Sequence, residues 1–156
     1  MKTKSPDAGR RYQALLQLLR TSETIWNASR LFFARWELSP SQFNILNLLQ
    51  DRADGLSQIE LSRELITHRS NITGLVDRLE RRGLLARHDV PNDRRAYLVT
   101  LTPAGRRLIL EILPEYHARA ETALEAVPVR RLAEFTRLLA GIHESAARVA
   151  TQLETH

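Results

Sequence analysis

The sequence predicts a mainly α-helical fold with one small β-hairpin in its second half. Apolar residues recur at steps of three and four over most of the chain, as a helix with one buried face requires. Only two short runs, residues 84–87 and 97–101, have the composition of β-strands, and they flank the turn sequence Val90-Pro-Asn-Asp93. The expected order is therefore a series of helices, a hairpin, and helices again.

The first half of the chain predicts three helices with well-marked ends. Residues 10–36 carry an apolar stripe at helical spacing, after a polar start that we expect to be frayed. Ser39-Pro-Ser-Gln42 begins the second helix, because the serine and the glutamine form a capping box and proline fits the first helical position. A turn at residues 51–55 ends it, and Ser57-Gln-Ile-Glu60 is a second capping box that opens a short helix.

The next helix follows a break near Thr67 and His68. Gly83 provides its C-terminal stop, and its apolar stripe consists of Ile72, Leu75, Val76 and Leu79. Two short helices joined by a few residues form a helix-turn-helix. Thr102-Pro103 then repeats the cap-plus-proline start after the hairpin.

The helices at the two ends of the chain predict a dimer. The helix after Thr102 is expected to bend or break at Pro114, and Pro128 starts a last helix that reaches Leu153. These helices and the first one have apolar stripes too wide for the middle of the chain to cover. Because large exposed apolar patches are uncommon on monomers, we expect a two-fold homodimer through the terminal helices. The alternative is a monomeric bundle that closes on itself.

The composition is that of an ordinary globular protein of one domain, with 156 residues of which 43% are hydrophobic and 26% charged. No apolar run approaches the roughly 18 residues that span a bilayer, and the basic start lacks the apolar stretch of a secretory signal. The absence of cysteine excludes disulfides, thiolate metal sites and thiol redox sensing. We therefore expect a cytoplasmic protein without a membrane partner.

The positive charge is concentrated in one segment. The formal net charge is +5, and Lys2 and Lys4 are the only lysines, so the cationic residues are almost all arginine. Arginine suits phosphates and guanine edges, although a GC-rich genome explains the arginine content equally well. Residues 68–95 contain seven arginines and four acidic residues, which is more than half of the excess charge.

The sequence has no recognisable catalytic or metal-binding motif. Its five histidines show no HExxH spacing, and lone surface histidines are far commoner than metal ligands. Neither a glycine-rich phosphate loop nor a GxSxG motif occurs. Asp51 and Asp54 are interpreted as a solvated turn rather than as paired catalytic carboxylates. We therefore expect neither an enzyme nor a cofactor.

The helix after the break has a polar face that suits a DNA major groove. Short polar side chains in its first turns let the backbone approach base edges and phosphates. A solvated surface explains this helix alone equally well. The residues that lie away from its apolar stripe are Arg69, Ser70, Asn71, Thr73, Gly74, Asp77 and Arg78.

The tip of the predicted hairpin bears Asp93, Arg94 and Arg95. Arginines there suit the narrow, electronegative minor groove, and the aspartate can orient a guanidinium through a charge-assisted bond. Hairpin tips are often charged merely for solubility. A basic tip next to a polar helix nevertheless favours a pair of DNA-reading elements.

Several segments fall together in an order and spacing that closely resemble the MarR family of bacterial winged helix-turn-helix regulators. They are residues 75–84 (LVDRLERRGL), residues 93–95 (DRR) and residues 99–105 (VTLTPAG). The resemblance spans nearly the whole chain, including the Ser-Pro-x-Gln-Phe start at Ser39. It implies a winged helix-turn-helix with N- and C-terminal dimerisation helices, acting as a homodimer on a pseudo-palindromic operator.

The resemblance also assigns roles to residues. It places the recognition helix at about residues 69–82 and the wing at residues 87–101. The family's Asp-x-Arg wing motif falls on Asp93 and Arg95, which makes Arg95 the expected minor-groove residue and Asp93 its orienter. Arg94 is then expected to contact a phosphate.

Two positions depart from the family pattern. His68 stands where a small polar cap is usual, and Gly74 stands where a longer side chain, often arginine, is common. One DNA contact is therefore expected to be missing. The departures support an alternative, a winged-helix protein-interaction module without DNA binding, against which residues 93–95 argue. No motif favours a helical enzyme or a ligand carrier.

Family members often release DNA when a small aromatic or phenolic acid binds between the dimerisation helices and the DNA-binding lobe. The resemblance therefore makes Trp26, Arg30, Phe33 and Phe43 candidate ligand residues, because aromatic rings with an arginine suit an aromatic carboxylate. Trp26 and Phe33 also lie on a stripe that needs a core in any case, which is the stronger explanation of the two.

The predicted organisation has three parts. Residues 1–37 form an N-terminal dimerisation helix, residues 38–102 a winged helix-turn-helix lobe, and residues 103–156 the C-terminal dimerisation helices. The predicted function is that of a cytoplasmic transcriptional regulator, expected to be a repressor, that binds an operator in double-stranded DNA as a homodimer and responds to a small aromatic ligand.

Overall fold

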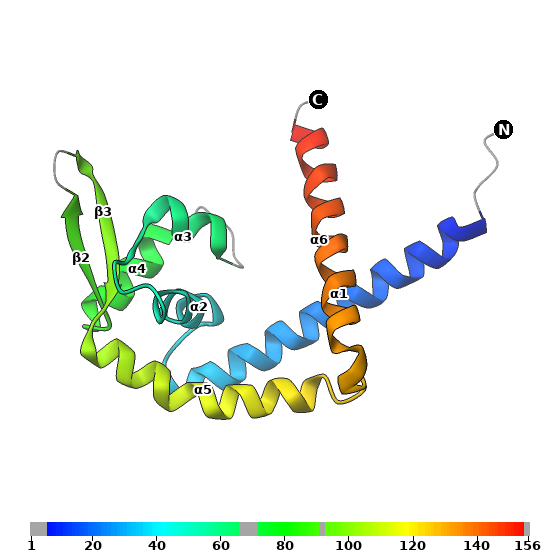
Figure 1. Cartoon of the computed structure of the whole chain (residues 1–156), viewed down its shortest axis with the longest axis horizontal. Helices are drawn as coiled ribbons and strands as arrows, with labels where there is room; N and C mark the ends of the chain where they lie inside the picture. Colours follow the sequence, from blue (N-terminus) through cyan, green and yellow to red (C-terminus); the bar gives the residue numbers. More distant parts are fainter. Residues whose placement is uncertain (1–5, 66–71, 91–92, 155–156) are drawn as a thin grey trace. The chain divides into compact units, whose positions relative to one another are not determined.

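The computed structural model describes residues 6–65, 72–90 and 93–154, except for the side chains of 6–8 and 93–96. Helices predominate and one small sheet is present (Figure 1), which confirms the predicted fold class. The chain divides into two compact units, residues 1–114 and residues 115–156. The elements in order are α1 (Pro6–Phe33), η1 (Ala34–Trp36), α2 (Pro40–Leu49), β1 (Leu56–Ser57), α3 (Gln58–Glu64), α4 (Ile72–Arg81), β2 (Leu85–Val90), β3 (Asp93–Leu101), α5 (Pro103–Ala123), η3 (Val129–Arg131) and α6 (Leu132–Glu154).

Helices α2 and α3 begin at the predicted capping boxes. The hydroxyl of Ser39 accepts from the amide of Gln42 at 3.2 Å, and the side chain of Gln42 accepts from the amide of Ser39 at 2.8 Å. Ser57 and Glu60 form the same reciprocal pair at 3.3 and 2.8 Å. Each box satisfies two amides that a helix start leaves without a partner inside the helix.

The sheet is antiparallel with the strand order β1-β3-β2. Strands β2 and β3 form the predicted hairpin, with Leu85 opposite Leu101. They extend further toward the tip than predicted, because cross-strand pairing continues beyond the apolar runs that marked them. Strand β1 was not predicted. It pairs Leu56 with Val99, and two residues are too few to show an alternating pattern of their own.

The core lies where α2, α3, α4, the sheet and the start of α5 meet. The four apolar residues predicted for α4 are each at most 4% exposed. Phe33, the last residue of α1, stacks on Phe43 of α2 with ring centroids 4.2 Å apart. This aromatic pair fixes the end of α1 on the core.

The start of α5 packs directly against the segment before β2. The hydroxyl of Thr102 donates to the carbonyl of Gly83 at 2.6 Å and accepts from the amide of Gly105 at 3.1 Å. A Cβ on Gly105 would lie only 2.1 Å from the carbonyl oxygen of Leu84. Only glycine fits at this close approach.

The C-terminal helices differ in two details from the prediction. The predicted break at Pro114 is absent, because α5 runs through this residue to Ala123, and the alternative, a bend, stays a prediction. An internal proline removes one helical hydrogen bond and crowds the preceding turn, and the flanking turns keep their helical form here. At the next proline, Pro128 precedes one turn of 3-10 helix, and α6 begins only at Leu132.

Candidate nucleic-acid interface

Helix α4 has one apolar and one polar face. Its four apolar residues are buried, whereas Thr73 and Arg78 are exposed. Asp77 lies on the polar side but is half-buried. The other contacts predicted on this helix lie outside the described residues: Arg69, Ser70 and Asn71.

The hairpin of β2 and β3 occupies the place of the predicted wing. Asp93, Arg94 and Arg95 are the first residues of β3, and Asp93 pairs with Val90 across the strands. Their backbone therefore lies next to the turn that joins the strands. Because their side chains are outside the described set, the roles assigned to them in DNA contact stay a prediction.

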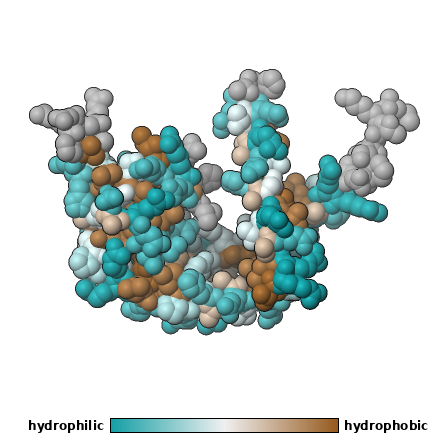
Figure 2. All heavy atoms as spheres, viewed as in Figure 1, coloured by the Kyte–Doolittle hydropathy of each residue, from teal (hydrophilic) through white to brown (hydrophobic). Residues whose placement is uncertain are grey.

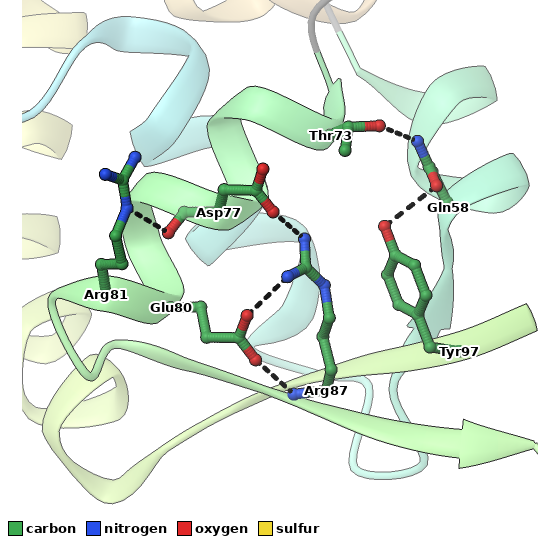
Figure 3. Close-up of polar contacts among 7 residues, drawn as sticks. All are labelled: Gln58, Thr73, Asp77, Glu80, Arg81, Arg87 and Tyr97. Atoms are coloured by element: carbon green, nitrogen blue, oxygen red, sulfur yellow. Dashed lines mark hydrogen bonds and ion pairs between the residues drawn. The ribbon is translucent and has the colours of Figure 1, made fainter.

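Arg87 of β2 joins the hairpin to α4 (Figure 3). Its guanidinium forms ion pairs with Glu80, at 2.5 Å, and with Asp77. The carboxylate of Glu80 also accepts from the backbone amide of Arg87 at 3.2 Å. Burial lowers the pKa of Arg87, but its contacts, led by the hydrogen bond to Asp77, raise that pKa above its ordinary value. The guanidinium therefore stays charged and holds two carboxylates of α4.

Tyr97 of β3 extends these contacts to α3 (Figure 3). The guanidinium of Arg87 lies over its ring, 4.7 Å from the centroid. The Tyr97 hydroxyl donates to the side-chain oxygen of Gln58 at 2.9 Å, and the Gln58 amide nitrogen donates to the hydroxyl of Thr73. The hairpin and both helices of the helix-turn-helix are thus linked by one polar cluster, which we call the Arg87 cluster: Gln58, Thr73, Asp77, Glu80, Arg87 and Tyr97.

The sequence did not reveal most of this cluster. Helical spacing placed Asp77 on the groove-facing side of α4, but its carboxylate is engaged by Arg87. Arg87, Gln58 and Tyr97 were not recognised, because partners that meet only in the tertiary structure leave no periodic pattern. The opposite charges of Glu80 and Arg87, close together in a helix–strand unit, were the one available signal.

A hollow of about 490 Å³ opens where α1 is followed by α2. Trp26 and Arg30, two of the predicted ligand residues, line it together with Ala34, Glu37 and residues 38–41. Phe33 and Phe43 are each only 1% exposed and pack in the core. The structure thus places two of the four candidates at a surface hollow, and their role in ligand binding stays a prediction.

Other kinds of site find no support among residues 6–65, 72–90 and 93–154. No group of three or more histidine or acidic residues is placed there to hold a metal ion. Within the same ranges, none of the helices has the length and apolarity that crossing a membrane requires.

Comparison with known proteins decides the family. Residues 36–96 match the model described as MarR family. Over 139 residues, 88% of this chain and 83% of the relative, the chain is 30% identical to the HTH-type transcriptional repressor YetL of Bacillus subtilis. The chain belongs to the MarR family. A solved MarR transcription factor from Planctomyces limnophilus is 32% identical, with a TM-score of 0.66 over 83% of this chain and 94% of that one.

A further solved structure adds information on ligands. BpsR of Bordetella bronchiseptica is 26% identical, with a TM-score of 0.73 over 81% of this chain and 90% of its own. Its structure concerns the regulation of BpsR DNA binding by 6-hydroxynicotinic acid. Membership of the MarR family confirms the predicted winged helix-turn-helix and makes this chain a transcriptional regulator rather than an enzyme.

Proposed function

We propose that this MarR-family chain is a homodimeric repressor that binds a pseudo-palindromic operator and releases it when a small aromatic acid binds. The Arg87 cluster is the observation that supports DNA binding most directly. It ties the hairpin to α4 through two carboxylates of that helix. A groove-reading helix and a wing held in one arrangement can contact adjacent grooves of one duplex without first being ordered.

Exposed apolar side chains on the terminal helices support the homodimer. Hydrophobic residues come to the surface in places among the hydrophilic ones on these helices (Figure 2). A monomer rarely leaves so many apolar residues in water, and a two-fold dimer would cover them and present two reading heads to a symmetric operator. The large apolar residues exposed on α1 and α6 are Tyr12, Leu15, Leu19, Ile25, Trp26, Leu31, Leu138, Leu139, Ile142, Val149 and Leu153.

The DNA contacts are divided between the two elements. Thr73 and Arg78, exposed on α4, face the major groove together with Arg69, Ser70 and Asn71 of the same predicted helix. On the wing, Arg95, oriented by Asp93, enters the minor groove and Arg94 meets a phosphate. The likeness to BpsR, whose DNA binding is regulated, supports DNA binding by this chain.

The hollow at the α1–α2 junction is the proposed effector site. Trp26 offers a ring face and Arg30 a cation, which together suit an aromatic carboxylate. BpsR, whose regulator is a hydroxylated aromatic acid, is the comparison that supports this class of ligand.

The test begins with selection of a duplex from a random DNA pool on the wild-type protein. Binding of the enriched duplex is then measured by fluorescence anisotropy at several salt concentrations. Arg94→Ala should weaken binding to all sequences and lower the salt dependence, because one phosphate contact per protomer is lost. Arg95→Ala should also reduce the preference for A·T-rich flanks.

The matched control is Arg130→Ala, which removes an exposed arginine of η3 outside the proposed interface. Its affinity should stay within about twofold of wild type, because Arg130 is not one of the proposed phosphate contacts. The wing assignment is wrong if all three variants behave alike. Failure to enrich any duplex would instead favour the protein-interaction module.

A further inference from the structure

The chain between α1 and α2 turns sharply at Glu37. This residue has φ 54° in the left-handed region and ends η1, with its amide donating to the carbonyl of Ala34 at 3.0 Å. The amide of Leu38 donates to Phe33 at 3.2 Å. The turn thus pairs its amides with the end of the helix, as a left-handed helix cap does, and its carbonyl groups can accept from other parts of the chain.

Arg82, at the end of α4, binds two of these carbonyls. One guanidinium nitrogen donates to the carbonyl of Glu37 at 2.7 Å and the other to that of Trp36 at 2.9 Å. The planar fork of arginine suits two neighbouring acceptors, whereas a lysine ammonium offers a single point of charge. This contact joins residues 45 and 46 positions apart in the sequence.

Both ends of this link are fixed. The amide of Arg82 donates to the carbonyl of Arg78 at 3.3 Å, so its backbone is bound to the last turn of α4. On the other side, the indole nitrogen of Trp36 donates to the carboxylate of Glu111 on α5 at 2.8 Å. A movement of the turn would therefore pull on the end of α4, because Arg82 is bonded to both.

The same turn borders the hollow. Ala34, Glu37 and Leu38 line it beside Trp26 and Arg30. Glu37 thus lines the hollow and has its carbonyl bound by Arg82 at the end of α4. A ligand that moves the turn must either stretch the contact to Arg82 or carry α4 with it.

We propose that Arg82 is the positioning residue that couples occupancy of the hollow to the position of α4. The empty hollow leaves the turn in place, and Arg82 holds α4 in its DNA-binding position. An aromatic acid that displaces Glu37 removes that support and lowers DNA affinity. This coupling rests on the proposed function, because it assumes that α4 reads DNA and that the hollow receives the effector.

The first test needs neither DNA nor effector. Hydrogen–deuterium exchange is compared in the wild type, Arg82→Met, Arg82→Lys and the control Arg81→Met. The control removes an equal charge from the same helix end, where Arg81 bonds only within α4 among its described contacts. Arg82→Met should speed exchange of amides 79–83 and 36–38 by roughly fivefold or more, because the opening of both segments becomes easier. Arg82→Lys should recover part of the protection.

The second test fills the hollow without a ligand. Ala34→Phe puts a ring into the hollow and should speed exchange of amides 79–83 when Arg82 is present. In the Arg82→Met background the same substitution should add nothing further for these amides. The thermal midpoint of each variant verifies that the fold is retained.

Two outcomes overturn the coupling. One is equal exchange in Arg82→Met and Arg81→Met, and the other is an Ala34→Phe effect on amides 79–83 that is unchanged by Arg82→Met.

Fluorescence anisotropy with the selected duplex distinguishes failure of the coupling from failure of the proposed function. In this measurement, Arg82→Met should bind the duplex about tenfold more weakly than Arg81→Met, a difference of roughly 1.4 kcal/mol in binding free energy. If exchange behaves as expected but no duplex binds, Arg82 links the hollow to α4 and the DNA-binding proposal fails.

Discussion

Replacing Arg87 by methionine tests the contact between the wing and α4. Methionine keeps an apolar stem of similar length and removes both ion pairs and the contact with the ring of Tyr97. The change also leaves Asp77 and Glu80 as neighbouring carboxylates without their shared cation. We therefore expect lower stability and a hairpin that is less firmly held against α4.

The exposure of these side chains sets the expected size of the effect. Arg87 is 25% exposed, and its partners Asp77 and Glu80 are 44% and 36% exposed. Exposed ion pairs contribute about 0.2–1 kcal/mol, and breaking a buried one costs about 3–5 kcal/mol. The Arg87 contacts lie between these limits, so Arg87→Met should lower the free energy of unfolding by about 2 kcal/mol. For a chain of this length the melting temperature then falls by about 6 °C.

Urea denaturation measures this loss, and a double-mutant cycle with Glu80→Gln isolates the pair. We expect a coupling energy of about 1 kcal/mol between Arg87 and Glu80. The control is Arg119→Met, which breaks an exposed ion pair with Glu115 on α5, at 3.4 Å and with Arg119 67% exposed. That variant should lose only about 0.3 kcal/mol. Equal losses in both variants, or a coupling energy near zero, would refute the structural role of Arg87.

Two further substitutions test the local packing and the helix start. Gly105→Ala places a Cβ against the carbonyl of Leu84 and should lower the free energy of unfolding by about 2–4 kcal/mol, because backbone must move to relieve the clash; a thermal midpoint equal to wild type would contradict it. The pKa of Glu60 lies below its ordinary value of 4.5, because the hydroxyl and then the amide of Ser57 donate to its carboxylate. A lowered folded-state pKa gives stability that is present above the unfolded-state value and is lost as the pH falls through the folded-state value. Urea melts should therefore show wild type more stable than Glu60→Gln at neutral pH and this difference disappearing in acid; a difference independent of pH would show that the charge of Glu60 contributes nothing.

The parts of the fold that depend on neighbouring residues could be predicted from the sequence. The capping boxes at Ser39 and Ser57 use partners three residues away, and both are present in the structure. The apolar stripe of α4 follows helical spacing and is buried. Family resemblance then supplied the winged helix-turn-helix, which the comparisons confirm.

The parts that depend on distant partners could not be predicted. Helical spacing places Asp77 on the groove-facing side of α4, but in the structure Arg87 binds it. The sequence likewise presents Arg82 as one more basic residue, although it binds the carbonyl of Glu37. Strand β1 exists only because residues 56–57 pair with residues 98–99 of β3. Helical spacing says which face of α4 is polar, but not which of its polar residues are already engaged.

Ser57 belongs to two elements at once. It pairs with Leu98 of β3 as the last residue of β1, and its hydroxyl caps the first turn of α3. An inserted residue at this point would shift either the strand register or the helix start, and the two cannot be corrected independently. The base of the sheet therefore stays in fixed register with the helix that it precedes.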